Sequence, residues 1–360
     1  MKARSSDLSI QLYTTCPASS TDPAAIQRPG FYSEGRETYL RKVIDAATWS
    51  EQCGFDGILV YIDNSLVNNW QIAQIVIENT RELIPLIATQ PVYMHPYWAA
   101  KTIASFGHLY GRRIALNMLA GAFRNDLIAL GDPTPHDNRY DRMVEYTQVI
   151  QKLLDGSGTP VTYEGEYYRI KNVKMHPPLE SALSPLVLMS GSSEAGMAAA
   201  RALDAVAVRY PKPVDCYEEE PLEEGINFGL RVGIIARDDE EEAWEIGRTR
   251  FEEDRRGQLV HQMAMKTSDS KWHKDLTSLD QDQLTESYPY WMTPFQNYKT
   301  FCPYLVGDYH KIASIVARYI KVGFRTFITD IPSDKEELLH QKLVFELALK
   351  QAASDLENAR

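Results

Sequence analysis

Short apolar runs alternate with segments of helical period along most of the chain. The runs are rich in Ile, Val and Leu and lack a helical repeat, which is typical of buried parallel strands. They span residues 8–14, 55–62, 84–89, 113–119, 205–208, 229–236 and 325–329, with one further run that begins at Leu186. The segments between them predict amphipathic helices. These cover 39–53, 70–80, 98–110, 142–154, 309–321 and 335–358, with a short helix at 125–130.

This alternation predicts an α/β fold, specifically a (β/α)8 TIM barrel with insertions. Parallel strands need crossover helices, and eight strand-helix units close into a barrel. A doubly wound open sheet is the alternative. That fold usually carries a GxGxxG loop after its first strand, and no such loop follows residues 8–14. We expect a single domain spanning residues 1–360.

Three features interrupt the regular cycle. The stretch VTYEGEYYRIKNV alternates around Glu164 and Gly165, which predicts a β-hairpin. A charged helix is expected after 229–236, opened by Asp238. Residues 257–306 show no convincing strand and many aromatic residues, so we expect an insertion near the barrel mouth that serves as a lid.

A strand that ends in a small-residue turn is the first candidate site. The sequence LVLMSGSSEA, residues 186–195, predicts a buried strand, a turn at Gly191, and a helix capped by Ser192 or Ser193. Free N–H groups at a helix start favour a phosphate. The plain alternative is an ordinary capped helix after a strand, which any α/β protein contains.

Charge and cysteine content exclude several classes. The formal net charge of -11 argues against nucleic acid or an anionic membrane as a partner. No signal-length or membrane-spanning apolar stretch is present, so a cytoplasmic protein is expected. The four cysteines lie far apart without a CxxC pair, which predicts neither a metal site nor a disulfide framework.

The order of several longer segments resembles one known family. The segments are GFDGILV, HDNRYDRMVEY, YEGEYYRIKN, PLVLMSGSSEAG, RVGIIARDDEEEAWE and RTFITDIP. Together they resemble the bacterial-luciferase-like flavin-dependent monooxygenases, and among these the alkanesulfonate monooxygenase branch. The resemblance runs almost from end to end.

The resemblance implies a cofactor, a co-substrate and partners. It implies that reduced FMN (FMNH2) binds at the carboxyl ends of the barrel strands and reacts with O2 to a C4a-peroxyflavin that oxygenates an organic substrate. It also implies a separate NAD(P)H:FMN reductase and a homo-oligomer, either a dimer or a tetramer.

The resemblance also implies cofactor-binding residues. Gly191, Ser192 and Ser193 would hold the phosphate, with Arg139 and Tyr140 beside them; for Arg139 and Tyr140 a local salt bridge and a packed ring are the alternatives. Asn117 is a polar residue in an apolar strand, so either it faces the flavin ring or it is a core amide satisfied internally. Gln90 is similarly placed near the ring.

The substrate side departs from the alkanesulfonate pattern. The family's arginine aligns with Arg231, but its histidine two residues later is Gly233, and its tryptophan after the sixth strand is Arg209. Where the family has a cysteine after the second strand, this chain has Ser65-Leu66. The family's tyrosine and histidine after the last strand are Ile331 and Ser333 here. A simple alkanesulfonate is therefore not the expected substrate.

The remaining charged residues define candidate catalytic positions. Arg231 and Arg209, with Lys299, would clamp an anionic substrate or stabilise the peroxyflavin, unless each pairs with a surface carboxylate. His95 is the best histidine for acid–base work, and a structural imidazole at a Pro-flanked turn is the alternative. An amino-acid-derived or carrier-bound substrate of secondary metabolism is plausible.

Two other functions remain open. The same barrel hosts deazaflavin-dependent hydride-transfer oxidoreductases, which would bind a deazaflavin and consume no oxygen. A non-catalytic flavin-binding subunit is the second alternative.

Overall fold

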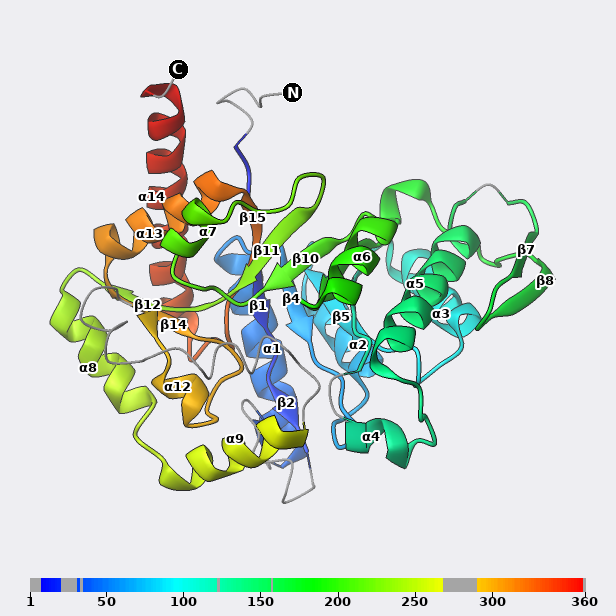
Figure 1. Ribbon diagram of the computed structural model, residues 1–360, viewed down its shortest axis with the longest axis horizontal. Helices are drawn as coiled ribbons and strands as arrows, with labels where there is room; N and C mark the ends of the chain where they lie inside the picture. Colours follow the sequence, from blue (N-terminus) through cyan, green and yellow to red (C-terminus); the bar gives the residue numbers. More distant parts are fainter. Residues whose placement is uncertain are drawn as a thin grey trace.

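The computed structural model describes residues 8–20, 31–32, 35–121, 124–156, 158–267 and 290–358. Its centre is a closed barrel of parallel strands, in which β1 pairs with β4 on one side and with β15 on the other (Figure 1). This confirms the predicted (β/α)8 barrel. The barrel strands are β1 (Gln11–Thr15), β4 (Gly57–Val60), β5 (Ile84–Thr89), β6 (Ala115–Met118), β9 (Leu186–Ser190), β10 (Val206–Arg209), β11 (Asn227–Arg231) and β15 (Phe324–Ile328).

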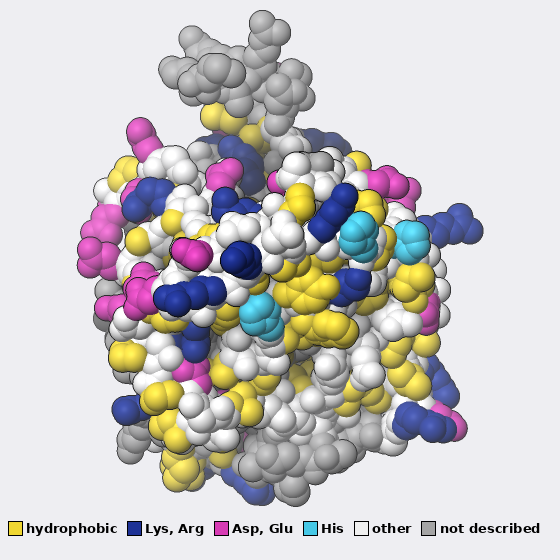
Figure 2. Space-filling view, turned by 90° about the vertical axis from the view of Figure 1, so that its right-hand side faces the viewer, with side chains coloured by type: hydrophobic (Ala, Val, Ile, Leu, Met, Phe, Trp, Pro, Cys, Tyr) yellow, Lys and Arg dark blue, Asp and Glu magenta, His cyan; other side chains and the backbone are white. Residues whose placement is uncertain are grey.

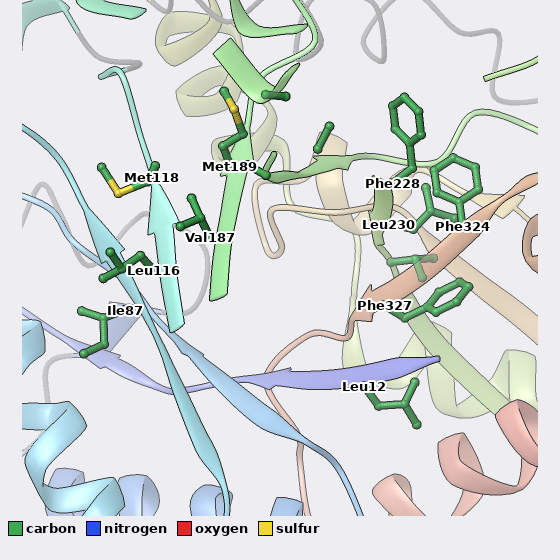
Figure 3. Close-up of a cluster of buried hydrophobic side chains, with 14 of the residues drawn as sticks. Leu12, Ile87, Leu116, Met118, Val187, Met189, Phe228, Leu230, Phe324 and Phe327 are labelled. Carbon is green, nitrogen blue, oxygen red and sulfur yellow. The ribbon is translucent and has the colours of Figure 1, made fainter. Parts of the chain in front are cut away.

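Side chains of the barrel strands alternate between two apolar layers. One layer fills the inside of the barrel with Tyr13, Leu59, Leu86, Ala115, Leu188, Val208 and Ile328. The other layer points outward to the helices and includes the side chains in Figure 3, among them Leu116, Met189, Leu230 and Phe327. Because successive residues of a strand face opposite sides, each polar residue on a strand can be assigned to the inside or the outside of the barrel.

Helices surround the barrel and lie close to their predicted positions, as Figure 1 shows. They are α1 (Arg36–Gln52), α2 (Asn69–Asn79), α3 (Pro96–Tyr110), α4 (Arg124–Ala129), α5 (His136–Leu153), α6 (Glu194–Leu203), α7 (Asp215–Glu219), α13 (Tyr309–Val322) and α14 (Lys335–Asn358). Helix α5 begins six residues before the predicted start at residue 142. The polar, Pro-rich sequence there suggested a loop, but Pro135 occupies the N-cap position, where its missing N–H costs no hydrogen bond.

The predicted strand at 229–236 is extended as expected, but its prediction as one continuous strand is wrong, because it is two strands. The barrel strand β11 ends at Arg231, and β12 (Gly233–Arg237) leaves the barrel to pair with β14 (Tyr304–Asp308). Gly233 permits this departure, since a β-carbon at that position would overlap the ring of Tyr304.

The predicted absence of strands from 257–306 is also wrong. Helix α9 (Arg255–Thr267) opens this region, and β13 (Tyr290–Trp291), α12 (Thr293–Gln296) and the first part of β14 close it. The apolar run of β14 is short and sits among aromatic residues that obscure its pattern. Residues 268–289 lie outside the described residues, so the lid stays a prediction.

Helix α8 (Glu240–Arg250) follows β12 and is capped by Asp239, not by the predicted Asp238. The Asp239 carboxylate accepts the backbone N–H of Glu242 at 2.9 Å. The acidic run allowed either residue, and the register of the first helical turn decides between them.

The predicted hairpin is confirmed as β7 (Val161–Glu164) and β8 (Arg169–Val173). Its turn is fixed by Glu145 of α5, whose carboxylate accepts the backbone N–H groups of Glu166, Tyr167 and Tyr168 at 2.6 to 3.1 Å. Gly165 allows this approach, because a β-carbon there would overlap the same carboxylate. The hairpin stands out at the right of Figure 1.

Smaller elements complete the described chain: β2 (Ala18–Ser19), β3 (Phe31–Tyr32) and a 3-10 turn at Ser181–Leu183. All four cysteines are free thiols. Among the described residues, no helix is long and apolar enough to span a bilayer, and no group of His, Cys, Asp and Glu is arranged to bind a metal ion.

Candidate active site

The turn between β9 and α6 combines a helix N-terminus with a buried hydroxyl. Ser193 is the N-cap, and its Oγ accepts the backbone N–H of Gly196 at 3.1 Å. This confirms Ser193 as one of the two predicted caps. Ser192 Oγ is buried and has no hydrogen-bond partner in the described part of the chain. A buried hydroxyl without a partner is costly, so a polar ligand atom at this position would complete it.

Tyr140 of α5 closes the same turn from the other side. Its hydroxyl lies so near Gly191 that a β-carbon on that glycine would be 2.7 Å away. Burial raises the pKa of Tyr140, and a hydrogen bond with Ser193 partly offsets this effect. The phenol is therefore neutral at physiological pH and can donate a proton in a hydrogen bond. Glycine is required at position 191 because the tyrosine occupies the space of a side chain.

Arg139 brings a positive charge to this corner. Its side chain is only 2% exposed, and its charge lowers the pKa of the adjacent Tyr140. Thus the structure brings Tyr140 together with Gly191 and Ser193, and Arg139 is the neighbour of Tyr140 on α5.

Asn117 and Ser190 form a polar pair at the inner face of the barrel. Asn117 is 6% exposed and lies on the same face as Ala115, which belongs to the inner layer. Ser190 Oγ donates to Asn117 Oδ1 at 3.4 Å, so the side-chain oxygen of Asn117 accepts a hydrogen bond from within the protein. Both residues lie near the carboxyl ends of β6 and β9, the end that carries active sites in barrels of this kind.

Gln90 follows β5 at the same end of the barrel. It is half-buried, and its Nε2 lies near Gly121, where an added β-carbon would be 3.1 Å away. Gln90 is therefore close to the loop that follows Asn117 and β6.

Arg231 ends β11 inside an aromatic enclosure. One terminal nitrogen donates to Tyr210 Oη at 3.2 Å and the other donates to Tyr61 Oη. The guanidinium carbon lies 5.0 Å from the ring centroid of Tyr61, 5.9 Å from that of Tyr210 and 5.7 Å from that of Phe301. Cation–π contacts of this kind hold a guanidinium in a fixed orientation.

Among the described residues, Arg231 has no direct ion-pair partner. The side chain is 8% exposed, and its Nε is buried without a hydrogen-bond partner in the described part of the chain. Burial lowers the pKa of Arg231 and raises that of the nearby Asp330, whose carboxylate accepts the Tyr304 hydroxyl at 2.9 Å. The arginine keeps its positive charge because its ordinary pKa is far above neutrality.

The structure does not bring Arg209 together with Arg231. Arg209 pairs in register with Leu230, a residue of the outer layer, whereas Arg231 pairs with Ile328 of the inner layer. Accordingly, Arg209 packs 4.6 Å from the ring centroid of Phe228 and donates to Met197 Sδ on α6 at 3.2 Å. Its catalytic role stays a prediction, but a clamp made by both arginines does not fit their opposite orientations.

The two other predicted polar residues occupy different surroundings. His95 is the exposed N-cap of α3, and its Nδ1 accepts the backbone N–H of Tyr97 at 3.2 Å. Lys299 forms an ion pair with Asp254 at 2.6 Å. Acid–base work by His95 stays a prediction.

Sequence reasoning missed Tyr61, Tyr210 and Asp330. Each follows the carboxyl end of a barrel strand, directly after β4 and β10 and two residues after β15. A polar or aromatic residue at such a strand end is the signal that could have found them.

These residues fit a flavin phosphate and ring. The unpartnered Ser192 hydroxyl, the close approach at Gly191 and the buried Arg139 suit a phosphate, and Asn117 and Gln90 offer amides near the barrel axis.

Comparison with known proteins identifies the family. The family model described as luciferase-like monooxygenase matches residues 20–326. The chain belongs to the luciferase-like monooxygenase family. The class of enzyme predicted from the sequence, a flavin-dependent monooxygenase, is therefore confirmed, whereas the alkanesulfonate branch is not.

Three proteins similar to this chain are named as monooxygenases. The 4-(gamma-L-glutamylamino)butanoyl-[BtrI acyl-carrier protein] monooxygenase BtrO of Niallia circulans is 33% identical over 321 residues, which are 87% of this chain and 93% of that protein. The long-chain alkane monooxygenase LadA superposes with a TM-score of 0.69 at 15% identity, covering 96% of this chain and 92% of its own. EDTA monooxygenase EmoA from Chelativorans sp. BNC1 gives 0.67 at 16% identity, covering 96% and 95%. The two structures support the luciferase-like fold alone.

Proposed function

We propose that this protein is a two-component, FMNH2-dependent monooxygenase that oxygenates an acyl substrate with an anionic group, carried on an acyl-carrier protein. The observation that carries the proposal is Arg231, a buried cation with an unpartnered Nε among aromatic rings at the carboxyl end of the barrel. The carrier-bound substrate is suggested by the name of the relative from Niallia circulans.

The cofactor side of the proposal rests on the turn at Gly191. The backbone of Gly191, the hydroxyls of Ser192 and Ser193, and the Arg139 guanidinium would hold the FMN phosphate, while Asn117 and Gln90 would orient the ring. Tyr140 would hold the turn in place. Reduced flavin, when bound, supplies the reaction with O2 that protein side chains cannot carry out themselves.

The substrate side rests on the Arg231 enclosure. Tyr61 and Tyr210 hold two nitrogens of the guanidinium and thereby direct its remaining donor capacity toward a substrate carboxylate. Phe301 and the two tyrosines form an apolar wall that excludes water from the reacting centre. A glutamylamino acyl chain, as in the relative's name, has the kind of anionic end that this arginine would bind.

The supply of reduced flavin and the assembly state are parts of the same proposal. We expect FMNH2 to come from a separate NAD(P)H:FMN reductase and the enzyme to form a homo-oligomer. The alkanesulfonate-like branch and a cytoplasmic location stay predictions.

The test is anaerobic titration of the purified protein with FMNH2, followed by admission of O2 together with acyl-carrier substrate. We expect oxygen uptake and incorporation of labelled oxygen into the acyl chain. Tight binding of a deazaflavin without oxygen uptake would favour the hydride-transfer alternative. Flavin binding without any substrate oxidation would favour the non-catalytic subunit.

A variant of Arg231 tests the substrate role separately. Arg231→Met should lower kcat/KM by about 100-fold, since a charge-assisted hydrogen bond contributes about 1.5 to 3 kcal/mol. Flavin affinity should change little. Lys299→Met is the matched control, because that cation is half exposed and pairs with Asp254 on the surface. Equal activities of the two variants would contradict the assignment of Arg231.

A further inference from the structure

Helix α9 is held firmly along one side. Gln258 Nε2 donates to Asn297 Oδ1 at 2.8 Å, and His261, 2% exposed, packs with its ring centroid 4.8 Å from that of Phe295. Gly257 lies against the backbone of Asn297 so closely that a β-carbon would overlap it. These residues are spaced by three or four and therefore share one face of the helix.

The opposite face of α9 is apolar, basic and exposed. Leu259 and Met263, one turn apart, are 58% and 67% exposed, and Arg255 and Arg256 are exposed at the start of the helix. Neither arginine has an ion-pair partner in the described part of the chain. The sequence of α9 itself contains no Asp or Glu, whereas Glu252, Glu253 and Asp254 directly precede it and the whole protein has a net charge of -11. We call Arg255, Arg256, Leu259 and Met263 the α9 face.

A chain of aromatic contacts connects this helix to the substrate enclosure. The His261 ring centroid lies 5.5 Å from that of Tyr298, which lies 6.3 Å from that of Phe301. Phe301 in turn contacts Arg231. Figure 1 shows α9 beside α12 at the lower end of the molecule, the end where α4 follows the carboxyl end of β6. A partner on the α9 face would therefore be next to the barrel mouth.

We infer that the α9 face is the docking surface for the acidic acyl-carrier protein that presents the substrate. This inference rests on the proposed function and names the partner's binding site. Arg255 and Arg256, which have no ion-pair partner in the described part of the chain, would attract carboxylates of a carrier. Leu259 and Met263 would pack against apolar side chains of the carrier. Two cations on an acidic protein are too few for nucleic acid, since the overall field repels phosphates.

The hairpin carries a second basic surface that serves as a control. Arg169, Lys171 and Lys174 are exposed and have no ion-pair partner among the described residues. Figure 2 shows the face with α3, β7 and β8, where basic side chains lie near apolar ones. In Figure 1 this hairpin lies at the right edge, away from α9. Among the described residues, the ring contacts of Tyr168, next to β8, are with His95 and Tyr146 and not with the rings around Arg231. The hairpin therefore offers three exposed cations, one more than the α9 face, without an aromatic connection to the substrate enclosure within the described chain.

The experiment compares charge reversal on the two surfaces. The substrates are one acyl chain, 4-(gamma-L-glutamylamino)butanoyl, presented either on a phosphopantetheinylated carrier protein or as a free pantetheine thioester. Arg255→Glu with Arg256→Glu should raise KM for the carrier-bound substrate at least about tenfold at low salt, with less effect at high salt. Turnover of the free thioester should stay at the wild-type value. Arg169→Glu with Lys171→Glu makes the same change of net charge and should leave KM and turnover unchanged for both substrates.

A second variant tests the apolar part of the α9 face. Leu259→Ser with Met263→Ser should raise the same KM without the salt dependence, because it removes apolar contact and no charge. Direct titration of each variant with the carrier protein separates docking from chemistry. If wild-type enzyme binds carrier but oxidises neither substrate, the proposed function fails while the docking site stands.

Three results would overturn the docking site. They are equal losses from the α9 and hairpin variants, equal losses with carrier-bound and free substrates, and unchanged carrier affinity of both α9 variants.

Discussion

The Tyr140 hydroxyl lies against Gly191, 2.7 Å from the point where a β-carbon on that glycine would be. A residue of α5 thus limits the side chain that the β9–α6 turn can carry. In the same turn, Ser192 has a buried hydroxyl without a hydrogen-bond partner among the described residues. A larger residue at position 191 would displace the turn, and with it the backbone N–H groups that a ligand would approach.

Gly191→Ala should weaken FMNH2 binding about tenfold or more, because an added methyl in a filled site costs about 1 to 3 kcal/mol and displaces the turn. Anaerobic fluorescence titration measures the affinity. Gly35→Ala is the control, since a β-carbon at Gly35 meets nothing within 4 Å. Adding Tyr140→Phe should restore part of the stability lost in Gly191→Ala, because the nearest contact is the hydroxyl. Wild-type affinity in Gly191→Ala would contradict the phosphate site.

Ser192→Ala and Ser193→Ala should have opposite effects on stability without flavin. Ser193→Ala removes the N-cap of α6 and should lower the free energy of unfolding by about 1 kcal/mol. Ser192→Ala removes a buried hydroxyl without a partner and should leave stability unchanged or raise it. Urea unfolding measures both. The double variant should bind FMNH2 markedly less tightly, and unchanged affinity would remove the phosphate assignment.

Glu145→Ala should loosen the turn of the β7–β8 hairpin. Its carboxylate accepts three consecutive backbone N–H groups, so its loss leaves donors unsatisfied and should cost about 3 kcal/mol locally. Amide hydrogen exchange at residues 166–168 should accelerate strongly. Glu164→Ala, an exposed carboxylate in the same hairpin, is the control. Unchanged protection at these amides would show that other contacts hold the turn.

His261 should make the stability of the α9 region depend on pH. Burial lowers the pKa of His261 from 6.5 to about 4, so the folded protein binds fewer protons than the unfolded chain between these values. Stability is therefore full above about pH 6.5 and is lost as pH falls toward 4, by about 1 to 3 kcal/mol. Hydrogen exchange in α9 measured across this range checks the effect. His261→Phe keeps an aromatic ring beside Phe295 and should reduce the pH dependence; an unaltered profile would assign it to other groups.

The strand and helix order of this protein follows from local pattern. Apolar runs and helical periods predicted the eight barrel strands, and β5 and α14 begin and end at the predicted residues. The serine cap of α6 was also predictable, since a cap depends on the residues of a single turn. Local signals of this kind also place polar residues at strand ends, where a barrel brings them together.

Contacts between distant segments needed the tertiary structure. The sequence reads as one strand through Val232, and only the ring of Tyr304 against Gly233 explains why β12 leaves the barrel. The sequence also presented Arg209 and Arg231 as equivalent cations. Strand register turns one toward α6 and the other into the barrel, because a shift of one residue reverses the face of a side chain.

The sequence by itself determined that this chain forms a barrel with a helix N-terminus at its mouth, because periodicity and capping act over a few neighbouring residues. Tertiary structure alone decided that Tyr61, Tyr210 and Phe301 enclose Arg231. These residues come from widely separated segments, and their meeting depends on barrel closure and on how the insertion packs over it.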